Sequence, residues 1–185
     1  MSLAPILLKT MELLLAIDAG LDSEGQDFIE ALKQLNRLPG EVRALLITHW
    51  HNDHAMVLLK GLLEEAPPRA VAASHHVHDG ERIEYSFIAI ASPAHTPGHV
   101  AYFHAPSRAL FCGNALAVVD DRLRLMSRPV TPDRVAARAS AIHCLKMDPA
   151  FICPGHRAPL IRNVASEVER FRRFLIESND WPLFG

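Results

Sequence analysis

One short segment constrains this chain more than any other, because it gathers four metal-ligating side chains within six residues. Its sequence is T-H-W-H-N-D-H, and the ligand types in it are His49, His51, Asp53 and His54. It follows an apolar stretch, Val42–Ile47, that is expected to form a buried strand, and a helix is expected to begin at Asp53 or His54. Alternate residues of an extended chain point the same way, so His49 and His51 are expected to converge on one point. Asp53 and His54 are expected to face a second point nearby.

Imidazole and carboxylate side chains are the ligands that a divalent transition metal such as zinc prefers, with iron or manganese as alternatives. Two further histidines follow Pro-Gly pairs at strand edges. His99 comes after T-P-G and before the expected strand Val100–Phe103, and His156 comes after P-G and the expected strand Ala150–Cys153. Because each sits at the same kind of strand-to-loop junction, both are candidate ligands. The alternative for the first segment is a solvated histidine-rich loop.

Short apolar stretches alternate with helical patterns, and this alternation predicts an α/β fold. The expected strands are residues 6–8, 13–17, 42–47, 70–73, 87–91, 100–103, 109–112 and 150–153. Two of them, 100–103 and 109–112, follow each other without a helix, so part of the sheet is expected to be antiparallel. The chain has 185 residues, of which 49% are hydrophobic and 22% charged, and shows no internal repeat or long linker. It is therefore expected to form a single domain over residues 1–185.

Two C-terminal helices are expected from apolar residues at helical spacing. One is expected to open at the cap Thr131-Pro132-Asp133, with proline at its first helical position. Its inward residues are expected to be Val135, Ala139, Ile142 and Leu145. The last helix is expected to bury Val164, Val168, Phe171 and Leu175 and to leave Glu167 in solvent.

Together these motifs resemble the metallo-β-lactamase superfamily. The resemblance rests on H-x-H-x-D-H at residues 49–54, T-P-G-H ending at His99, P-G-H ending at His156, and I-D-A-G at residues 17–20. It implies an αβ/βα four-layer sandwich, with metals at one edge of two central sheets. The implied ligands of the first metal are His49, His51 and His99. The implied ligands of the second metal are Asp53, His54 and His156.

Asp18, in the I-D-A-G motif, is implied by the same resemblance to support a ligand or the backbone of the metal loops. The alternative is that Asp18 merely caps the turn before Gly20.

One departure from the family pattern concerns the second metal. The family places a bridging aspartate at the end of a segment of the form L-F-x-G-D, and here the segment is L-F-C-G-N, ending at Asn114. An amide is neutral and a weaker metal ligand than a carboxylate. With Asn114 as a ligand, the second site is expected to be weak and the chain to hold one metal under ordinary conditions.

A second departure lies at the N-terminus. The family strand that precedes the stretch Ile6–Thr10 has no counterpart, so the sandwich is expected to lack its first strand. This leaves a sheet edge that something else must cover, and a homodimer is expected as one way to cover it.

The resemblance implies a zinc-dependent hydrolase that holds one or two ions. A metal-activated water would attack an ester, thioester, lactone or similar bond of a small molecule, and Asp53 would be the catalytic carboxylate that orients the hydroxide. The chain ends soon after the expected helix at residues 164–178, so the glutathione-binding helical domain of glyoxalase II is not expected. Two alternatives stay open: a mononuclear iron oxidoreductase resembling the sulfur dioxygenases of this fold, and a degenerate, non-catalytic metal-binding homologue.

The composition of the chain argues against nucleic acid and membranes as partners. The net charge of −2 gives no electrostatic case for nucleic acid, and the longest apolar run, five residues, is too short to span a membrane. Cys112, Cys144 and Cys153 are an odd number at scattered spacing, which is typical of buried thiols in a reducing compartment, so a cytoplasmic protein is expected.

Overall fold

The computed structural model describes residues 6–9, 14–18, 20, 26–51, 54 and 75–181. The chain divides into two compact units, residues 1–76 and 77–185. Each unit is built around its own β-sheet. The single domain expected for residues 1–185 stays a prediction.

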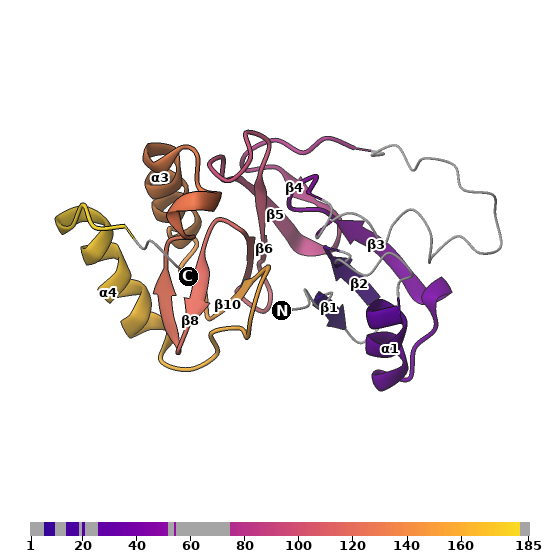
Figure 1. Ribbon diagram of the computed structural model, residues 1–185. Helices are drawn as coiled ribbons and strands as arrows, with labels where there is room; N and C mark the ends of the chain where they lie inside the picture. The colour runs from indigo at the N-terminus through magenta and orange to yellow at the C-terminus, as the bar shows by residue number, and fades with distance from the viewer. Residues whose placement is uncertain are drawn as a thin grey trace. The chain divides into compact units, whose positions relative to one another are not determined.

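Among its described residues, the N-terminal unit contains a three-stranded sheet and one helix. The sheet has the order β1 (Ile6–Lys9), β2 (Leu14–Ile17) and β3 (Val42–Leu46), with β1 antiparallel to β2 and β2 parallel to β3. The helix α1 (Gln26–Gln34) connects β2 to β3 and packs against the sheet (Figure 1). Phe28 and Leu32, four residues apart on one face of α1, are buried against Leu14 and Ala16 of β2.

In the C-terminal unit, residues 77–181 form a five-stranded sheet, a hairpin and two helices (Figure 1). The sheet has the order β10 (Phe151–Pro154), β7 (Ala109–Gly113), β6 (Val100–His104), β5 (Phe87–Ala91) and β4 (Arg82–Ile83). The hairpin consists of β8 (Ala117–Val119) and β9 (Arg122–Arg124), and the helices are α3 (Arg134–Leu145) and α4 (Val164–Glu177). Single turns of 3₁₀ helix lie at Pro39–Glu41 and Arg128–Val130. Glu84–Ser86 forms a turn with left-handed φ at Tyr85 (61°) and Ser86 (63°).

Strand direction in this sheet determines which loops meet. β6 is antiparallel to β7, and β10 is parallel to β7. The start of β6 and the ends of β7 and β10 therefore lie at the same edge of the sheet. The residues that immediately precede β6 and follow β7 and β10 include His99, Asn114 and His156.

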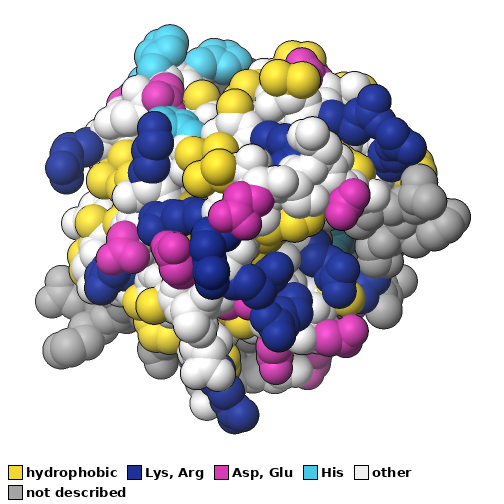
Figure 2. Space-filling view, turned by 90° about the vertical axis from the view of Figure 1, so that its left-hand side faces the viewer, with side chains coloured by type: hydrophobic (Ala, Val, Ile, Leu, Met, Phe, Trp, Pro, Cys, Tyr) yellow, Lys and Arg dark blue, Asp and Glu magenta, His cyan; other side chains and the backbone are white. Residues whose placement is uncertain are grey.

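The core of the C-terminal unit lies between one face of the sheet and the two helices. Side chains from alternate positions of β6 and β7 pack with residues of α3 and α4, among them Leu110, Cys112, Leu145 and Phe171. In the described helices, none combines the length and the apolar character needed to cross a bilayer. On the side of the molecule that carries α3 and α4, Lys and Arg side chains are interspersed with Asp and Glu (Figure 2), in keeping with the small net charge.

The expected strands are confirmed to within one residue at each end, except residues 70–73, which lie outside the described residues. The antiparallel pairing of strands 100–103 and 109–112 is confirmed as well. The body of the helix expected from Asp53 or His54 also lies outside the described residues. The hairpin β8–β9 was not predicted. Its two-residue turn, Asp120-Asp121, has positive φ at both positions (51° and 56°) but lacks the glycine that usually marks such a turn.

Two expectations about the helices are wrong. α3 begins at Arg134 with Asp133 as its N-cap, whose side chain accepts a hydrogen bond from the Ala136 backbone N–H, so Pro132 lies before the helix. Val135, expected inward, is 82% exposed. Asp133 shifts the start of α3 by two residues, and the buried face then consists of Ala137, Ser140, Ala141, Cys144 and Leu145.

The second wrong expectation concerns α4. Its stripe Val164, Val168, Phe171 and Leu175 is buried as expected, but Glu167 is buried too. Glu167 accepts hydrogen bonds from the Leu123 backbone N–H (2.7 Å), from Arg122 and from Arg170. Burial works against ionisation of Glu167, but hydrogen bonds from Arg170 and Leu123 outweigh it and hold the pKa of the carboxyl below its usual value. Glu167 thus ties α4 to the hairpin.

Candidate metal centre

The loop after β3 gathers three imidazole rings within the N-terminal unit. The ring centroids of His49 and His51 are 4.9 Å apart, and those of His49 and His54 are 4.0 Å apart. A backbone hydrogen bond from His54 N–H to His51 O, 2.9 Å, closes the turn that brings His54 back toward His49. His49 and His54 are buried, and His51 is partly exposed. The sequence-predicted histidines 49, 51 and 54 therefore form one cluster.

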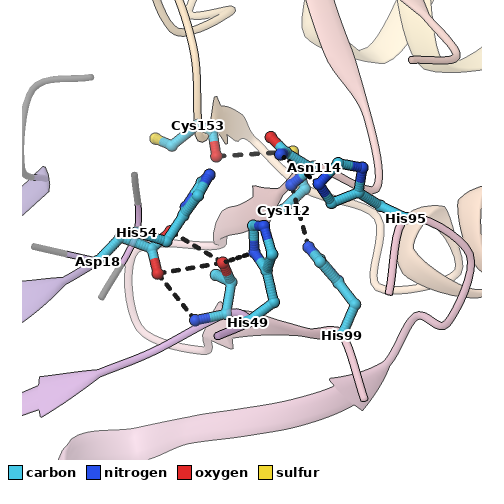
Figure 3. Close-up of polar contacts among 9 residues, drawn as sticks. Asp18, His49, His54, His95, His99, Cys112, Asn114 and Cys153 are labelled. Atoms are coloured by element: carbon cyan, nitrogen blue, oxygen red, sulfur yellow. Dashed lines mark hydrogen bonds and ion pairs between the residues drawn. The ribbon is translucent and has the colours of Figure 1, made fainter. Parts of the chain in front are cut away.

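Asp18, directly after β2, lies beside His49 and His54 and supports this cluster (Figure 3). Because β2 and β3 are parallel neighbours, the residues that follow them lie side by side. The Asp18 carboxylate accepts hydrogen bonds from the Thr48 backbone N–H (2.8 Å) and from the Thr48 hydroxyl (2.9 and 3.1 Å). It also accepts one from His54 Nδ1, at 2.7 Å. The expected supporting position of Asp18 is confirmed by these contacts.

These contacts determine which ring nitrogen carries the proton in two histidines. A carboxylate only accepts, so His54 Nδ1 donates to Asp18. The Thr48 hydroxyl uses its one hydrogen on Asp18 and therefore accepts from His49 Nδ1, 3.0 Å away. In both rings Nε2 is then the nitrogen with the lone pair, which is the form a metal ligand needs.

In the C-terminal unit, the loop before β6 and the turn after β7 are joined through His99. His99 Nε2 accepts a hydrogen bond from the Asn114 backbone N–H, at 3.0 Å. His99 Nδ1 therefore carries the ring proton and donates to the Ser92 hydroxyl, at 2.8 Å. His99 is 1% exposed. Since Nε2 is the nitrogen left to bind a metal, metal binding at His99 would replace its hydrogen bond to Asn114.

His156 lies in the loop after β10, beside the turn that carries Asn114. The Gly155 backbone N–H donates to Gly113 O at 2.9 Å, and His156 and Asn114 are the next residues along the two segments. His156 is partly exposed, whereas Asn114 is 4% exposed. Sheet topology thus brings His99, Asn114 and His156 to one edge of this unit.

Two other histidines, His104 and His143, have structural contacts of their own, and the catalytic candidate Asp53 lies outside the described residues. His143, on α3, pairs with Asp79 at 2.9 Å, and this hydrogen bond lowers the pKa of the Asp79 carboxyl. His104 packs against Phe87, with ring centroids 5.0 Å apart, and burial lowers the pKa of the His104 ring.

Sequence analysis missed Thr48 and Ser92, which hold His49 and His99. Each is a small hydroxyl residue at the end of a strand, and that position is the only sequence signal for it. Both hydroxyl groups belong to the hydrogen-bonded support that orients a histidine ring.

The cysteines offer no competing nucleophile within the described residues. Cys112 and Cys144 are buried, as expected, while Cys153 is partly exposed. Burial raises the pKa of the Cys144 thiol to about 12 and that of Cys153 to about 11, and raises that of Cys112 as well. At neutral pH all three remain protonated thiols, which are poor nucleophiles.

The residues present fit a divalent transition metal. In the N-terminal cluster, His49 and His54 carry their ring protons on Nδ1, which leaves the Nε2 lone pairs for a metal. Imidazole is a preferred ligand of zinc and iron. In the C-terminal unit, Asn114 Oδ1 is a buried oxygen without a hydrogen-bond partner among the described residues.

Comparisons with known proteins agree with this assignment. Residues 6–87 match the family model described as the metallo-beta-lactamase superfamily. A hydroxyacylglutathione hydrolase from Serratia proteamaculans is 40% identical over 104 residues, covering 50% of this chain and 39% of that protein. The chain therefore spans about two fifths of the length of this relative.

Solved structures show the same fold. A metallo-beta-lactamase family protein from Thermus thermophilus has a TM-score of 0.64 at 18% identity, covering 93% of this chain and 77% of that one. The protein TTHA1623, solved in a di-iron-bound form, has a TM-score of 0.60 at 21% identity, covering 84% of this chain and 87% of that one.

The architecture is the metallo-β-lactamase fold, so the predicted mixed α/β fold class is confirmed. The resemblance that the histidine motifs indicated is confirmed with it: residues 6–87 match the metallo-beta-lactamase superfamily model, and the solved structures share its fold.

Proposed function

We propose that the chain is a metal-dependent hydrolase that cleaves a thioester, ester or lactone of a small molecule. The observation that carries the proposal is the hydrogen-bonded group Asp18–Thr48–His49–His54, which holds two imidazoles in the form that binds metal. A buried aspartate that accepts several hydrogen bonds from one histidine loop is typical of the residues that support metal ligands. It orients the ligand rings and makes them better donors.

The proposed ligands are those of the sequence analysis. His49, His51 and His99 would hold the first metal, and Asp53, His54, Asn114 and His156 would hold a second. The superfamily binds divalent metals, usually zinc, so zinc is the proposed ion. When bound, the metal supplies a water nucleophile at neutral pH and Lewis acidity toward the substrate oxygen.

The chain's own residues have distinct proposed tasks. Thr48 and Asp18 keep the protons of His49 and His54 on Nδ1, away from the metal side of each ring. Asp53 is the proposed carboxylate that orients the attacking water. That water adds to the carbonyl carbon, the bond from this carbon to sulfur or oxygen breaks, and the thiol or alcohol leaves with a proton.

A thioester is the favoured substrate, because the curated relative from Serratia is named a hydroxyacylglutathione hydrolase. A homodimer, as expected from the sheet edge at β1, remains part of the proposal and is measured by light scattering of the full chain.

Hydrolysis assays on the full chain test the proposal. The panel would contain a hydroxyacylglutathione thioester, a simple ester, a lactone and a phosphodiester. We expect turnover of at least one of the first three, its loss in a chelator and its return with zinc. The double variant His49→Ala/His51→Ala should be inactive, while the control His143→Ala, on the surface of α3, should keep wild-type turnover. A metal-loaded protein that hydrolyses none of these substrates would contradict the proposal.

A further inference from the structure

The Asn114 side chain, in the turn after β7, has two ends in different surroundings (Figure 3). Its Nδ2 lies 3.2 Å from Nε2 of His95. Its Oδ1 is buried and meets no hydrogen-bond donor within the described parts of the chain. Buried carbonyl oxygens in native proteins are nearly always paired, so this oxygen is a candidate metal ligand.

The proton on His95 can be assigned from its other contact. His95 Nδ1 lies 2.6 Å from the backbone oxygen of Val130, at the end of the 3₁₀ turn Arg128–Val130. A carbonyl oxygen only accepts, so Nδ1 carries the hydrogen, and Nε2 of the neutral ring is an acceptor. Nε2 therefore accepts from the Asn114 amide N–H. The opposite amide orientation would place Oδ1 against the lone pair of Nε2.

We propose that His95 is a positioning residue that fixes the orientation of the Asn114 amide. The ring holds Nδ2, and Oδ1 is thereby turned away from His95 as a neutral oxygen ligand. The ligand role of Oδ1 rests on the proposed function, whereas the pairing of His95 with Asn114 is a property of the chain without metal.

This pairing gives a reason for an amide at a position where the superfamily usually has a carboxylate. An asparagine side chain has a donor group, Nδ2, at one end and an acceptor oxygen, Oδ1, at the other, which matches an acceptor nitrogen on one side and a metal on the other. An aspartate would place a second acceptor against His95 Nε2. The acceptor nitrogen of His95 thus matches the amide donor of Asn114, and this pairing would be lost with an aspartate at position 114.

Nitrogen NMR of the metal-free protein, labelled in histidine, tests the pairing directly. The proposal requires the Nδ1–H form of His95, and a neutral His95 with its proton on Nε2 would overturn it. This measurement needs neither metal nor activity, so its outcome is separate from that of the proposed function.

Zinc affinity, measured by competition with a chromophoric chelator, tests the positioning role. His95→Phe keeps an aromatic ring but removes the acceptor, and should weaken zinc binding about 10- to 100-fold. His95→Gln keeps an acceptor in its side-chain carbonyl and should restore most of the affinity. In an Asn114→Ala background, His95→Phe should cause no further loss, because its effect acts through Asn114.

The outcomes separate the two claims. A His95→Phe variant that binds zinc as tightly as the wild type overturns the positioning role, as does an equal loss in the Asn114→Ala background. A wild-type chain that binds no zinc overturns the ligand role of Asn114 and the proposed function, and the NMR result still decides the pairing.

Discussion

Replacing Thr48 with valine should weaken both the N-terminal unit and its hold on metal. Valine has nearly the shape of threonine but lacks the hydroxyl that donates to Asp18 and accepts from His49. The variant loses one hydrogen bond to a carboxylate and leaves the His49 Nδ1–H buried without its acceptor. Each of these effects is worth about 1–3 kcal/mol. We expect the free energy of unfolding of the metal-free protein to fall by about 3 kcal/mol.

The same change should lower zinc affinity about 10- to 100-fold, because the hydroxyl fixes the proton position in His49. Chemical denaturation and chelator competition measure the two effects. Thr48→Ser is the matched control, since it keeps the hydroxyl, and it should stay near wild type in both assays. A Thr48→Val protein that matches the wild type in stability and zinc affinity would refute the proposed hydrogen-bonded support.

Three further predictions concern other parts of the molecule. Glu167→Gln should lower the free energy of unfolding by about 2 kcal/mol at neutral pH, while Glu169→Gln, an exposed neighbour, should change it little. Because folding lowers the pKa of the Glu167 carboxyl, the ionised carboxylate stabilises the folded protein fully at pH values above its unfolded-state pKa, near 4.5. This stabilisation is lost as the pH falls through the folded-state pKa. Denaturation at a series of pH values should therefore show the difference in unfolding free energy between wild type and variant shrinking in that range. A thiol reagent at about pH 8 should modify Cys144 and Cys153 slowly in the native protein and fast in denaturant, since burial raises both thiol pKa values. Zinc titration followed by NMR should shift the Asn114 backbone amide, because its hydrogen bond to a ring nitrogen would be replaced.

The strands and the histidine loop could be predicted from sequence because their signals are local. Apolar runs that end at proline, glycine or histidine define the strands, and His49, His51 and His54 are close together in the chain. Sequence spacing predicted that His49 and His51 converge on one point and that His54 faces a second point nearby. The ring distances show His54 at least as close to His49 as His51 is, because the turn after His51 brings it back.

What could not be predicted depends on partners that are distant in sequence. Glu167 is charged, so helical periodicity assigns it to solvent, yet its partner Leu123 lies 44 residues away in a hairpin without a glycine turn. Thr48 is likewise an ordinary threonine until Asp18, 30 residues earlier, is placed beside it. Such side chains gain their role from tertiary contacts, which local patterns do not encode.

Metal analysis of the chain purified without added metal tests the central claim most directly. The wild-type protein should carry at least one divalent transition metal per chain, retained through dialysis against buffer without chelator. The variant His49→Ala/His51→Ala should lose this tightly bound metal while remaining folded. A wild-type chain that binds no metal even after incubation with zinc, or a double variant that keeps the full metal content, would contradict the account.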